Sequence, residues 1–269
     1  MTLKSRLRQL LPHPPGQPVP TSQGTVYKAA SGADWYHPVI LGPITIGALA
    51  LQPATLRDAM QIVARLEPDE YTQYLQSYYQ TGLEHFGEAW RYADIVTVLL
   101  AAARLVHPQN YLEVGVRHGR SVAIVAAACP QVDIVGFDLW VKDYAGMPNP
   151  GPDFVRKELN KLGYAGSLGL ISGDSYSTLP AYFQIHPDAF FDLATVDGDH
   201  SQAGAEKDLR IVLSRLKLGG VAVFDDINHP LLPHLRDVWQ RVVVADRRFS
   251  TWEFAELGYG VGLAVRRET

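Results

Sequence analysis

The stretch that decides the expected fold is Tyr111-Leu112-Glu113-Val114-Gly115-Val116-Arg117-His118-Gly119-Arg120-Ser121. A short run with strand character, residues 110–114, is followed at once by two glycines four residues apart, and a helical stretch comes next. Glycines at such a position permit a tight turn and let the backbone approach a ligand closely at a helix N-terminus. The stretch therefore predicts a strand, a glycine turn and a helix, the first unit of an α/β fold.

Further along the chain, short apolar runs of strand length alternate with helical stretches. The runs cover residues 110–114, 133–137, 168–172, 190–196 and 220–224. Alternation of this kind predicts an α/β fold with a doubly wound, mostly parallel, Rossmann-like sheet of about seven strands. Residues 251–255 and 259–266 alternate in polarity around Leu257-Gly258, and they predict a closing antiparallel hairpin.

The chain before residue 108 has a different character. Residues 1–52 are rich in proline and glycine, and we expect an irregular N-terminal arm there. Residues 53–107 carry apolar side chains at helical spacing and predict a helical N-terminal layer, in which Thr55 and Asp58 resemble a capping box. The α/β domain is expected to occupy residues 108–269.

Composition and charge narrow the class of protein. The chain of 269 residues is 47% apolar and 19% charged, which excludes a disordered chain. A formal net charge of −4 gives no surplus of positive charge, so we expect no nucleic-acid partner. The single cysteine, Cys129, cannot form an internal disulfide, which favours a reducing compartment and a cytoplasmic location. The longest apolar stretch, residues 39–51, is interrupted by Gly42 and Pro43, so no membrane helix is expected.

Polar residues at the ends of the expected strands are the candidate ligand-binding residues, because open α/β sheets bind ligands beyond the carboxyl ends of their strands. Asp138 ends the second strand roughly 20 residues after Gly115, where a doubly wound fold accepts hydrogen bonds from a ribose diol. Asp174 and Ser175 follow the third strand, and Asp174 is suited either to receive an adenine amino group or to cap a helix. These residues favour a nucleoside ligand.

The residues of the glycine turn bear on the charge of that ligand. The fingerprint G-x-G-x-x-G of nicotinamide and flavin dinucleotides is absent. Glu113 puts negative charge before the turn, which suits a cationic or hydroxyl-bearing ligand better than a diphosphate. Three cationic residues act in the opposite direction: Arg117, His118 and Arg120. A nicotinamide cofactor therefore stays open as an alternative, as does a purely structural turn.

Four carboxylates follow the fourth and fifth strands: Asp197, Asp199, Asp225 and Asp226. If these strands are neighbours, Asp197, Asp225 and Asp226 converge at one edge of the sheet, where unpaired carboxylates repel one another. A divalent cation would remove that repulsion, and oxygen ligands suit Mg²⁺, Mn²⁺ or Ca²⁺ rather than zinc. His200, three residues after Asp197, is the candidate general base. The alternative interpretation is a set of solvated loop aspartates and helix caps.

Together these motifs resemble the class I S-adenosylmethionine-dependent methyltransferases over residues 108–269. Within that class, Glu113-Val114-Gly115-x-x-x-Gly119-x-Ser121 and Asp197-Gly198-Asp199-His200-Ser201 resemble the branch of macrocin-type sugar O-methyltransferases and cephalosporin hydroxylase-like proteins. Two features depart from that pattern. The segment Gln202-Ala203-Gly204 stands where an aromatic residue is common, and His118 lies in the glycine turn.

The resemblance implies S-adenosylmethionine as the cofactor, together with Mg²⁺ or another oxygen-preferring divalent cation. The cofactor residues that it implies are Glu113, Gly115, Gly119 and Ser121 at the methionine part, Asp138 at the ribose, and Asp174 with Ser175 near the adenine. The metal ligands that it implies are Asp197, Asp225 and Asp226, and the catalytic residues are His200, as the base, and Asp197.

The expected function is metal-assisted methylation of a hydroxyl group on a small molecule, such as a sugar, a natural product or a catechol-like compound. A metal-independent methyltransferase, a nicotinamide-dependent oxidoreductase and a non-catalytic cofactor-binding module remain as alternatives. The loop of residues 140–152 and the cluster Asp34-Trp35-Tyr36-His37 are two candidates for a segment that covers the site. The tyrosine-rich helical layer offers surface for a homo-oligomer.

Overall fold

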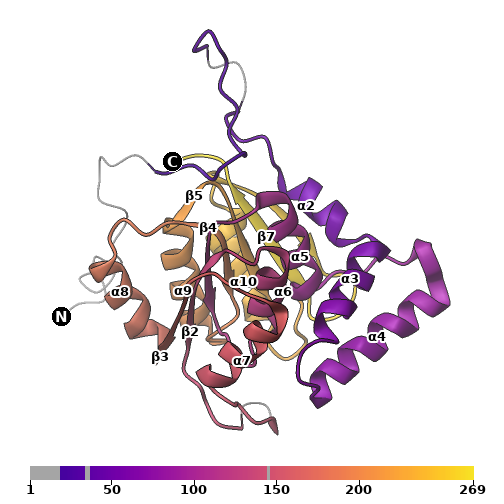
Figure 1. Cartoon of the computed structure of the whole chain (residues 1–269). Coiled ribbons are helices and arrows are strands. Elements are labelled where there is room, and N and C mark those ends of the chain that lie inside the picture. Colours follow the sequence, from indigo (N-terminus) through magenta and orange to yellow (C-terminus); the bar gives the residue numbers. More distant parts are fainter. Residues whose placement is uncertain (1–18, 34–36, 144–145) are drawn as a thin grey trace.

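A seven-stranded sheet forms the centre of the molecule (Figure 1). The computed structural model describes residues 19–33, 37–143 and 146–269. The strands are β1 (Asn110–Val114), β2 (Asp133–Asp138), β3 (Leu168–Ser172), β4 (Phe191–Val196), β5 (Leu216–Asp225), β6 (Phe249–Phe254) and β7 (Val261–Arg266). They lie in the order β3-β2-β1-β4-β5-β7-β6, and β1 to β5 are parallel while β7 runs antiparallel to both of its neighbours. The predicted doubly wound sheet with its closing hairpin is confirmed.

Helices cover both faces of this sheet (Figure 1). The face that includes the N-terminal layer carries α2 (Pro43–Ala50), α3 (Pro53–Val63), α5 (Ile95–Val106), α6 (Arg120–Ala128) and α7 (Pro152–Leu162), with α4 (Glu70–Phe86) and the short η1 (Gly87–Ala89) further out. The other face carries α8 (Ser175–Ile185), α9 (Gln202–Ser214), α10 (His234–Trp239) and η3 (Gln240–Val244). Each face has its own apolar core, so the sheet is buried on both sides.

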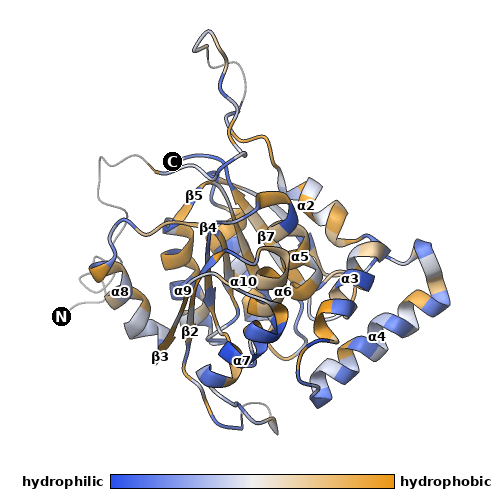
Figure 2. Cartoon of the chain, viewed as in Figure 1, coloured by the Kyte–Doolittle hydropathy of each residue, from blue (hydrophilic) through white to orange (hydrophobic). Residues whose placement is uncertain are grey.

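Helix α5 explains how the N-terminal layer joins the α/β domain. It is apolar along most of its length (Figure 2) and packs against α2 and α6 as well as against β4 and β5. Its start is fixed by a capping box, in which the Asp94 carboxylate accepts from the Thr97 backbone N–H and the Asp94 backbone N–H donates to the Thr97 hydroxyl. The helical layer and the sheet therefore share one core.

The expected capping box at Thr55 and Asp58 is wrong. Helix α3 begins at Pro53 after Gln52, which makes no side-chain cap, and the Thr55 hydroxyl instead donates to the carbonyl of Leu49 at 2.7 Å. The fixed φ of Pro53 is already compatible with the first helical position, so α3 starts without a side-chain cap. Boxes of the Asp-x-x-Thr type occur instead at Asp94 and at the start of α4.

The N-terminal arm is more regular than expected, because residues 43–50 form helix α2, with Pro43 at its first position and Ile46 and Ala50 buried against the sheet side. Residues 19–33 and 37–42 stay outside helices, and a bridge between Val26 and Val39 makes them double back in a projection from the body (Figure 1). Residues 1–18 and the aromatic cluster at 34–36 lie outside the described residues.

A buried aspartate ties the base of this arm to the sheet. The Asp192 carboxylate accepts from the Ser22 hydroxyl at 2.7 Å, from the Gln109 and Asn110 backbone N–H groups at 3.0 Å, and from the Lys217 ammonium at 2.9 Å. Asp192 is 2% exposed. Because a buried carboxylate is tolerated only when its oxygens are fully bonded, this cluster is a structural centre at the amino ends of β1, β4 and β5.

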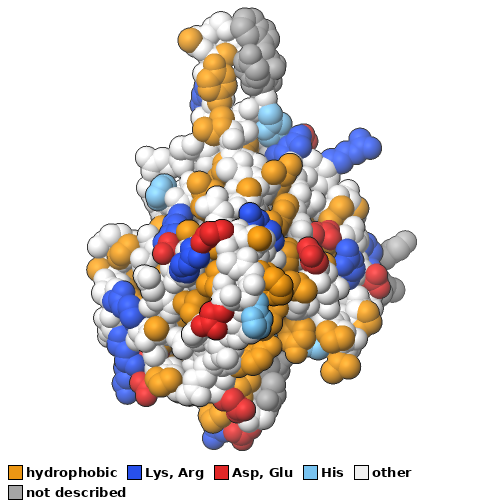
Figure 3. Space-filling model, turned by 90° about the vertical axis from the view of Figure 1, so that its right-hand side faces the viewer, with side chains coloured by type: hydrophobic (Ala, Val, Ile, Leu, Met, Phe, Trp, Pro, Cys, Tyr) orange, Lys and Arg blue, Asp and Glu red, His pale blue; other side chains and the backbone are white. Residues whose placement is uncertain are grey.

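None of the helices in the described part of the chain is both long enough and apolar enough to span a bilayer. Seen from the side of α4, apolar, acidic and basic side chains are interspersed over the surface rather than gathered by type (Figure 3).

Replacing Asp192 should strongly destabilise the fold. Asp192→Ala leaves the Lys217 charge and three other donors without their acceptor, and we expect a loss of about 3 to 5 kcal/mol in the free energy of unfolding. Urea denaturation measures it. As a control, Asp58→Ala breaks the pair with Arg104, in which both side chains are 40% exposed, and should change stability by about 1 kcal/mol or less. Equal losses in the two variants would contradict this assignment.

Candidate active site

The glycine turn lies against the end of β4. Gly115 has a φ of +94°, and a Cβ placed on it would fall 1.9 Å from the backbone oxygen of Asp197. The Asp197 backbone N–H in turn donates to the Val114 carbonyl at 2.8 Å. Gly119 has a φ of +73°, and a Cβ placed on it would fall 2.8 Å from a side-chain methyl group of Val155 in α7. Position 115 accommodates only glycine, because the backbone of the turn after β1 is in contact with the backbone of the loop after β4.

Glu113 is fully buried below this turn. Its two carboxylate oxygens accept from the hydroxyls of Tyr111 and Ser121. Burial raises the pKa of Glu113 to about 8, although the Ser121 and Tyr111 hydrogen bonds act in the opposite direction. The Tyr111 hydroxyl also lies 2.8 Å from the Thr195 hydroxyl on β4. Glu113 is therefore an oriented acid directly before the glycine turn.

Asp138, at the end of β2, is held by two backbone groups. Its oxygens accept from the Arg117 N–H at 2.7 Å and from the Trp140 N–H at 2.5 Å. Each carboxylate oxygen has two lone pairs, so this bonding orients the group and still leaves acceptor capacity for a ligand.

Asp174 and Ser175 lie after β3, further along the same edge. Asp174 caps α8 by accepting from the Tyr176 N–H at 2.9 Å, and Ser175 donates to the Asp208 carboxylate at 2.9 Å. Burial raises the pKa of Asp208 to about 7. The helix cap, one of the two roles considered for Asp174, is thus present, and the Ser175 hydroxyl is directed toward α9.

The ends of β4 and β5 bring three side chains together. The two strands are paired, with Val196 opposite Phe224, so the residues that follow them are neighbours. One ligand atom each from Asp197, His200 and Asp226 lies within 4.8 Å of the others. The Nε2 atom of His200 is 3.4 Å from an Asp197 oxygen and 3.1 Å from an Asp226 oxygen. Imidazole nitrogen and carboxylate oxygens in such a group could hold a divalent cation.

Asp225 interacts electrostatically with Asp197 and Asp226 but is not one of the three residues whose ligand atoms lie together. Burial and the charges of Asp197 and Asp226 raise the pKa of Asp225 well above its ordinary value. Burial and the Asp226 charge also raise the pKa of Asp197, whereas His200 acts to lower it. Negative charge is thus crowded at this edge, where a cation would be stabilised.

The glycine turn is also bonded to the helical layer, which sequence reasoning missed. Asp69, the N-cap of α4, accepts from Arg120 and lies 3.1 Å from the His118 Nδ1 atom. The Arg120 guanidinium lies over the Tyr71 ring, 4.6 Å from its centroid. The His118 Nε2 atom bonds to the carbonyl of Pro148, in the loop after β2. The Asp-x-x-Thr pattern at Asp69 was a signal for the cap, but the sequence carries none for these partners. Tyr144 of the loop lies outside the described residues.

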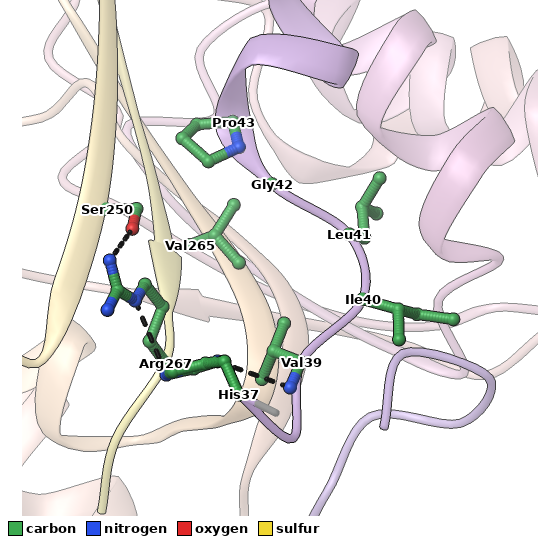
Figure 4. A pocket seen from close by; sticks show the side chains of 9 residues that line it. All are labelled: His37, Val39, Ile40, Leu41, Gly42, Pro43, Ser250, Val265 and Arg267. Atoms are coloured by element: carbon green, nitrogen blue, oxygen red, sulfur yellow. Dashed lines mark hydrogen bonds between the residues drawn. The ribbon is translucent and has the colours of Figure 1, made fainter. Parts of the chain in front are cut away.

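A separate hollow of about 380 Å³ lies at the opposite edge of the sheet (Figure 4). Its polar residues are Arg267, His37 and Ser250, and Arg267 donates to the Ser250 hydroxyl at 2.8 Å and to His37 at 3.4 Å. Val265, another lining residue, pairs with Val221 in the middle of β5, four residues before Asp225. This hollow is therefore distinct from the carboxylate cluster.

A model of a known protein family matches the part of the chain that contains this edge. Residues 112–227 match the model of a family described as a methyltransferase domain. The matched segment begins in β1 and ends just after β5, so it includes Glu113, Asp138, Asp197 and Asp226. A search of the curated proteins finds no match.

Solved structures with a similar fold include methyltransferases. One is CalS11, described as a TDP-rhamnose 3'-O-methyltransferase of calicheamicin biosynthesis, with 19% identity, a TM-score of 0.52, and coverage of 79% of this chain and 93% of that one. Another is the O-methyltransferase TomG from Streptomyces achromogenes, with 18% identity, a TM-score of 0.50, and coverage of 83% and 94%. At these identities the likeness establishes the fold alone.

Glu113→Gln should change how stability depends on pH. The folded chain keeps the proton on Glu113 up to about pH 8, whereas an ordinary glutamate loses it near pH 4.5. Between these values the folded state binds more protons than the unfolded state, so the wild-type carboxyl destabilises the fold increasingly as pH rises. The variant should therefore gain stability over the wild type from about pH 5 to pH 8. Urea denaturation at pH 5 and pH 8 measures this gain, with the exposed Glu256→Gln as the control. An equal difference at both pH values would contradict it.

Proposed function

We propose that this chain, an S-adenosylmethionine-dependent methyltransferase by its domain and fold, transfers the methyl group to a hydroxyl of a small molecule with the help of a divalent cation. The observation that carries the proposal is the convergence of Asp197, His200 and Asp226 at the carboxyl edge of the sheet, beside the glycine turn. A glycine turn alone would support cofactor binding. The adjacent acidic cluster supports the chemistry.

The cofactor would lie across the carboxyl ends of β1 to β3. Glu113, Gly115, Gly119 and Ser121 would face its methionine part, where a cationic amino group close to Glu113 would favour the ionised form of this acid. Asp138 would accept from the ribose diol, and Asp174 with Ser175 would lie near the adenine. The oriented carboxylate of Asp138 and the close backbone approach at Gly115 support this arrangement. The TomG structure was solved in complex with SAM, which also supports it. When bound, this cofactor supplies an electrophilic methyl group.

The metal would be held by Asp197, Asp225 and Asp226. The donor set fits an oxygen-preferring cation such as Mg²⁺, because these carboxylates are crowded, and burial together with their mutual repulsion raises the pKa of Asp225 and Asp197. When bound, the cation would supply positive charge that orients an acceptor hydroxyl and lowers its pKa. His200 is a poorer ligand for Mg²⁺ than Asp225, since Mg²⁺ prefers oxygen.

His200 would then accept the proton of the acceptor hydroxyl. Its Nε2 atom lies between Asp197 and Asp226, so the two carboxylates would stabilise the imidazolium that forms. The chain's other contribution would be to hold the acceptor oxygen in line with the methyl group. The loop of residues 140–152, bonded to His118 through Pro148, would cover the acceptor.

The most specific part of the proposal is the chemical class of the molecule that accepts the methyl group. Two adjacent hydroxyls, as in a sugar or a catechol, could approach a cation together, and the motif resemblance to macrocin-type sugar O-methyltransferases favours a sugar or another natural product. The description of CalS11 as a TDP-rhamnose 3'-O-methyltransferase points the same way. A role in natural-product biosynthesis and a cytoplasmic location complete the proposal.

Asp197→Asn should strongly reduce methyl transfer while sparing cofactor binding. We expect activity on a panel that includes catechol and TDP-rhamnose to fall by about a hundredfold or more, because a ligand of the cation and a partner of His200 is lost together. Radiolabelled methyl transfer, with Mg²⁺ or with EDTA, measures activity, and calorimetry measures the Kd for S-adenosylhomocysteine. Asp199→Asn, in the same loop but outside the cluster, is the matched control.

Three results would refute parts of this proposal. Transfer that is unaffected by EDTA would exclude the metal and leave a metal-independent methyltransferase. Tight binding of NAD without binding of S-adenosylhomocysteine would exclude the methyltransferase and favour an oxidoreductase. Tight S-adenosylhomocysteine binding with no methylated product across the panel would favour a non-catalytic module.

Substitution of His200 distinguishes a role as general base from a role as metal ligand. With His200 as the base, His200→Gln lowers kcat by about a hundredfold and leaves the calorimetric Kd for Mn²⁺ within twofold of wild type. Asp225→Asn should instead weaken Mn²⁺ binding by about tenfold or more. The reverse pattern would make His200 the third metal ligand in place of Asp225.

A further inference from the structure

We propose that Asp69, in the helical layer, is a positioning residue of the cofactor site, which acts by holding the glycine turn through His118 and Arg120. The inference rests on the proposed binding of the cofactor at that turn. It assigns to the N-terminal helical layer a part in cofactor binding.

The contacts of Asp69 reach both sides of the turn. One carboxylate oxygen of Asp69 meets both Arg120 and the His118 Nδ1 atom. These two residues flank Gly119, one of the two glycines of the turn, and Arg120 is the first residue of α6. The side chains of His118 and Arg120 are 10% and 12% exposed, so the ion pair is largely shielded from water. Shielding makes such a pair stronger than a surface pair.

Asp69 is itself fixed in place. Its other oxygen accepts from the Thr72 N–H at 2.7 Å, and its own N–H donates to the Thr72 hydroxyl at 2.8 Å. Burial acts to raise the pKa of Asp69, but the hydrogen bonds from Thr72 and the charge of Arg120 outweigh it and lower the pKa. The two oxygens thus have separate tasks, since one caps α4 and the other holds the turn.

The turn needs such support because its backbone is unfavourable for most residues. Gly115 and Gly119 have positive φ values, and Arg117 between them has a φ of +49°. The Arg117 N–H is bonded to Asp138 on one side, and His118 is bonded to Asp69 on the other. A turn that is ordered before the ligand arrives loses less conformational entropy on binding. Asp69 therefore strengthens cofactor binding from a position on another helix.

Asp69→Asn isolates this role from helix capping. Asparagine is as good an N-cap as aspartate, so the variant keeps the cap of α4 and removes the charge that holds Arg120 and His118. We expect the calorimetric Kd of the full chain for S-adenosylhomocysteine to rise by about tenfold, the order of a lost charge-assisted hydrogen bond. Arg120→Gln should raise it similarly, and the double variant should be little worse than either single one.

Asp58→Asn is the matched control, because it removes another aspartate of the helical layer, whose partner Arg104 does not belong to the turn. Its Kd should stay within twofold of wild type. If the role of Asp69 is purely structural, Asp69→Asn lowers the Tm and leaves the Kd unchanged, and that result would overturn the inference. An equal weakening of S-adenosylhomocysteine binding by Asp58→Asn would overturn it as well. Absence of S-adenosylhomocysteine binding by the wild type would overturn the proposed function itself, and the inference with it.

Discussion

The contact between Gly115 and the backbone of Asp197 is the constraint on which the rest of the site depends. The two residues follow β1 and β4, which are central neighbours in the sheet. Because any side chain at Gly115 would overlap the Asp197 carbonyl, glycine alone lets the glycine turn after β1 and the loop after β4 meet. A cofactor on the turn and a cation on the loop would then be neighbours, so an acceptor hydroxyl oriented by the cation would lie close to the methyl group of the cofactor.

The same closeness has an electrostatic consequence. Glu113, Asp197 and Asp225 are all carboxyl groups whose pKa values are raised by burial, and neighbouring negative charges raise them further. Such groups destabilise a fold when they ionise, so the sheet edge is less stable than an apolar edge would be. The cluster at Asp192, at the other end of the strands, is the opposite case, because there an ammonium and two backbone N–H groups surround one carboxylate. The fully bonded carboxylate thus lies at the amino ends of the strands, and the crowded carboxylates lie at their carboxyl ends.

Strands were predictable from the sequence where apolar runs are bounded by clear breaks, as at residues 168–172, which match β3. The grouping of Asp197 with Asp226 was predictable on the condition that the two strands before them are adjacent, which the pairing of β4 with β5 satisfies. The position of His200 between them was not, since the path of the loop after β4 sets it. Helix α2 was missed because Pro43 and the glycines around it suggested an irregular chain, whereas proline fits the first turn of a helix.

The two Asp-x-x-Thr boxes explain why part of the site lies beyond sequence reasoning. Asp69 and Asp94 form the same local structure, with the same pair of hydrogen bonds to a threonine three residues later. Their remaining oxygens differ, because Asp94 accepts from the Tyr79 hydroxyl within the core and Asp69 accepts from Arg120 of the glycine turn. Local sequence thus determines the cap, while the position of the start of α4 beside His118 and Arg120 determines what else the carboxylate does. A residue of this kind is found only when the tertiary structure is known, even though its motif is plain in the sequence.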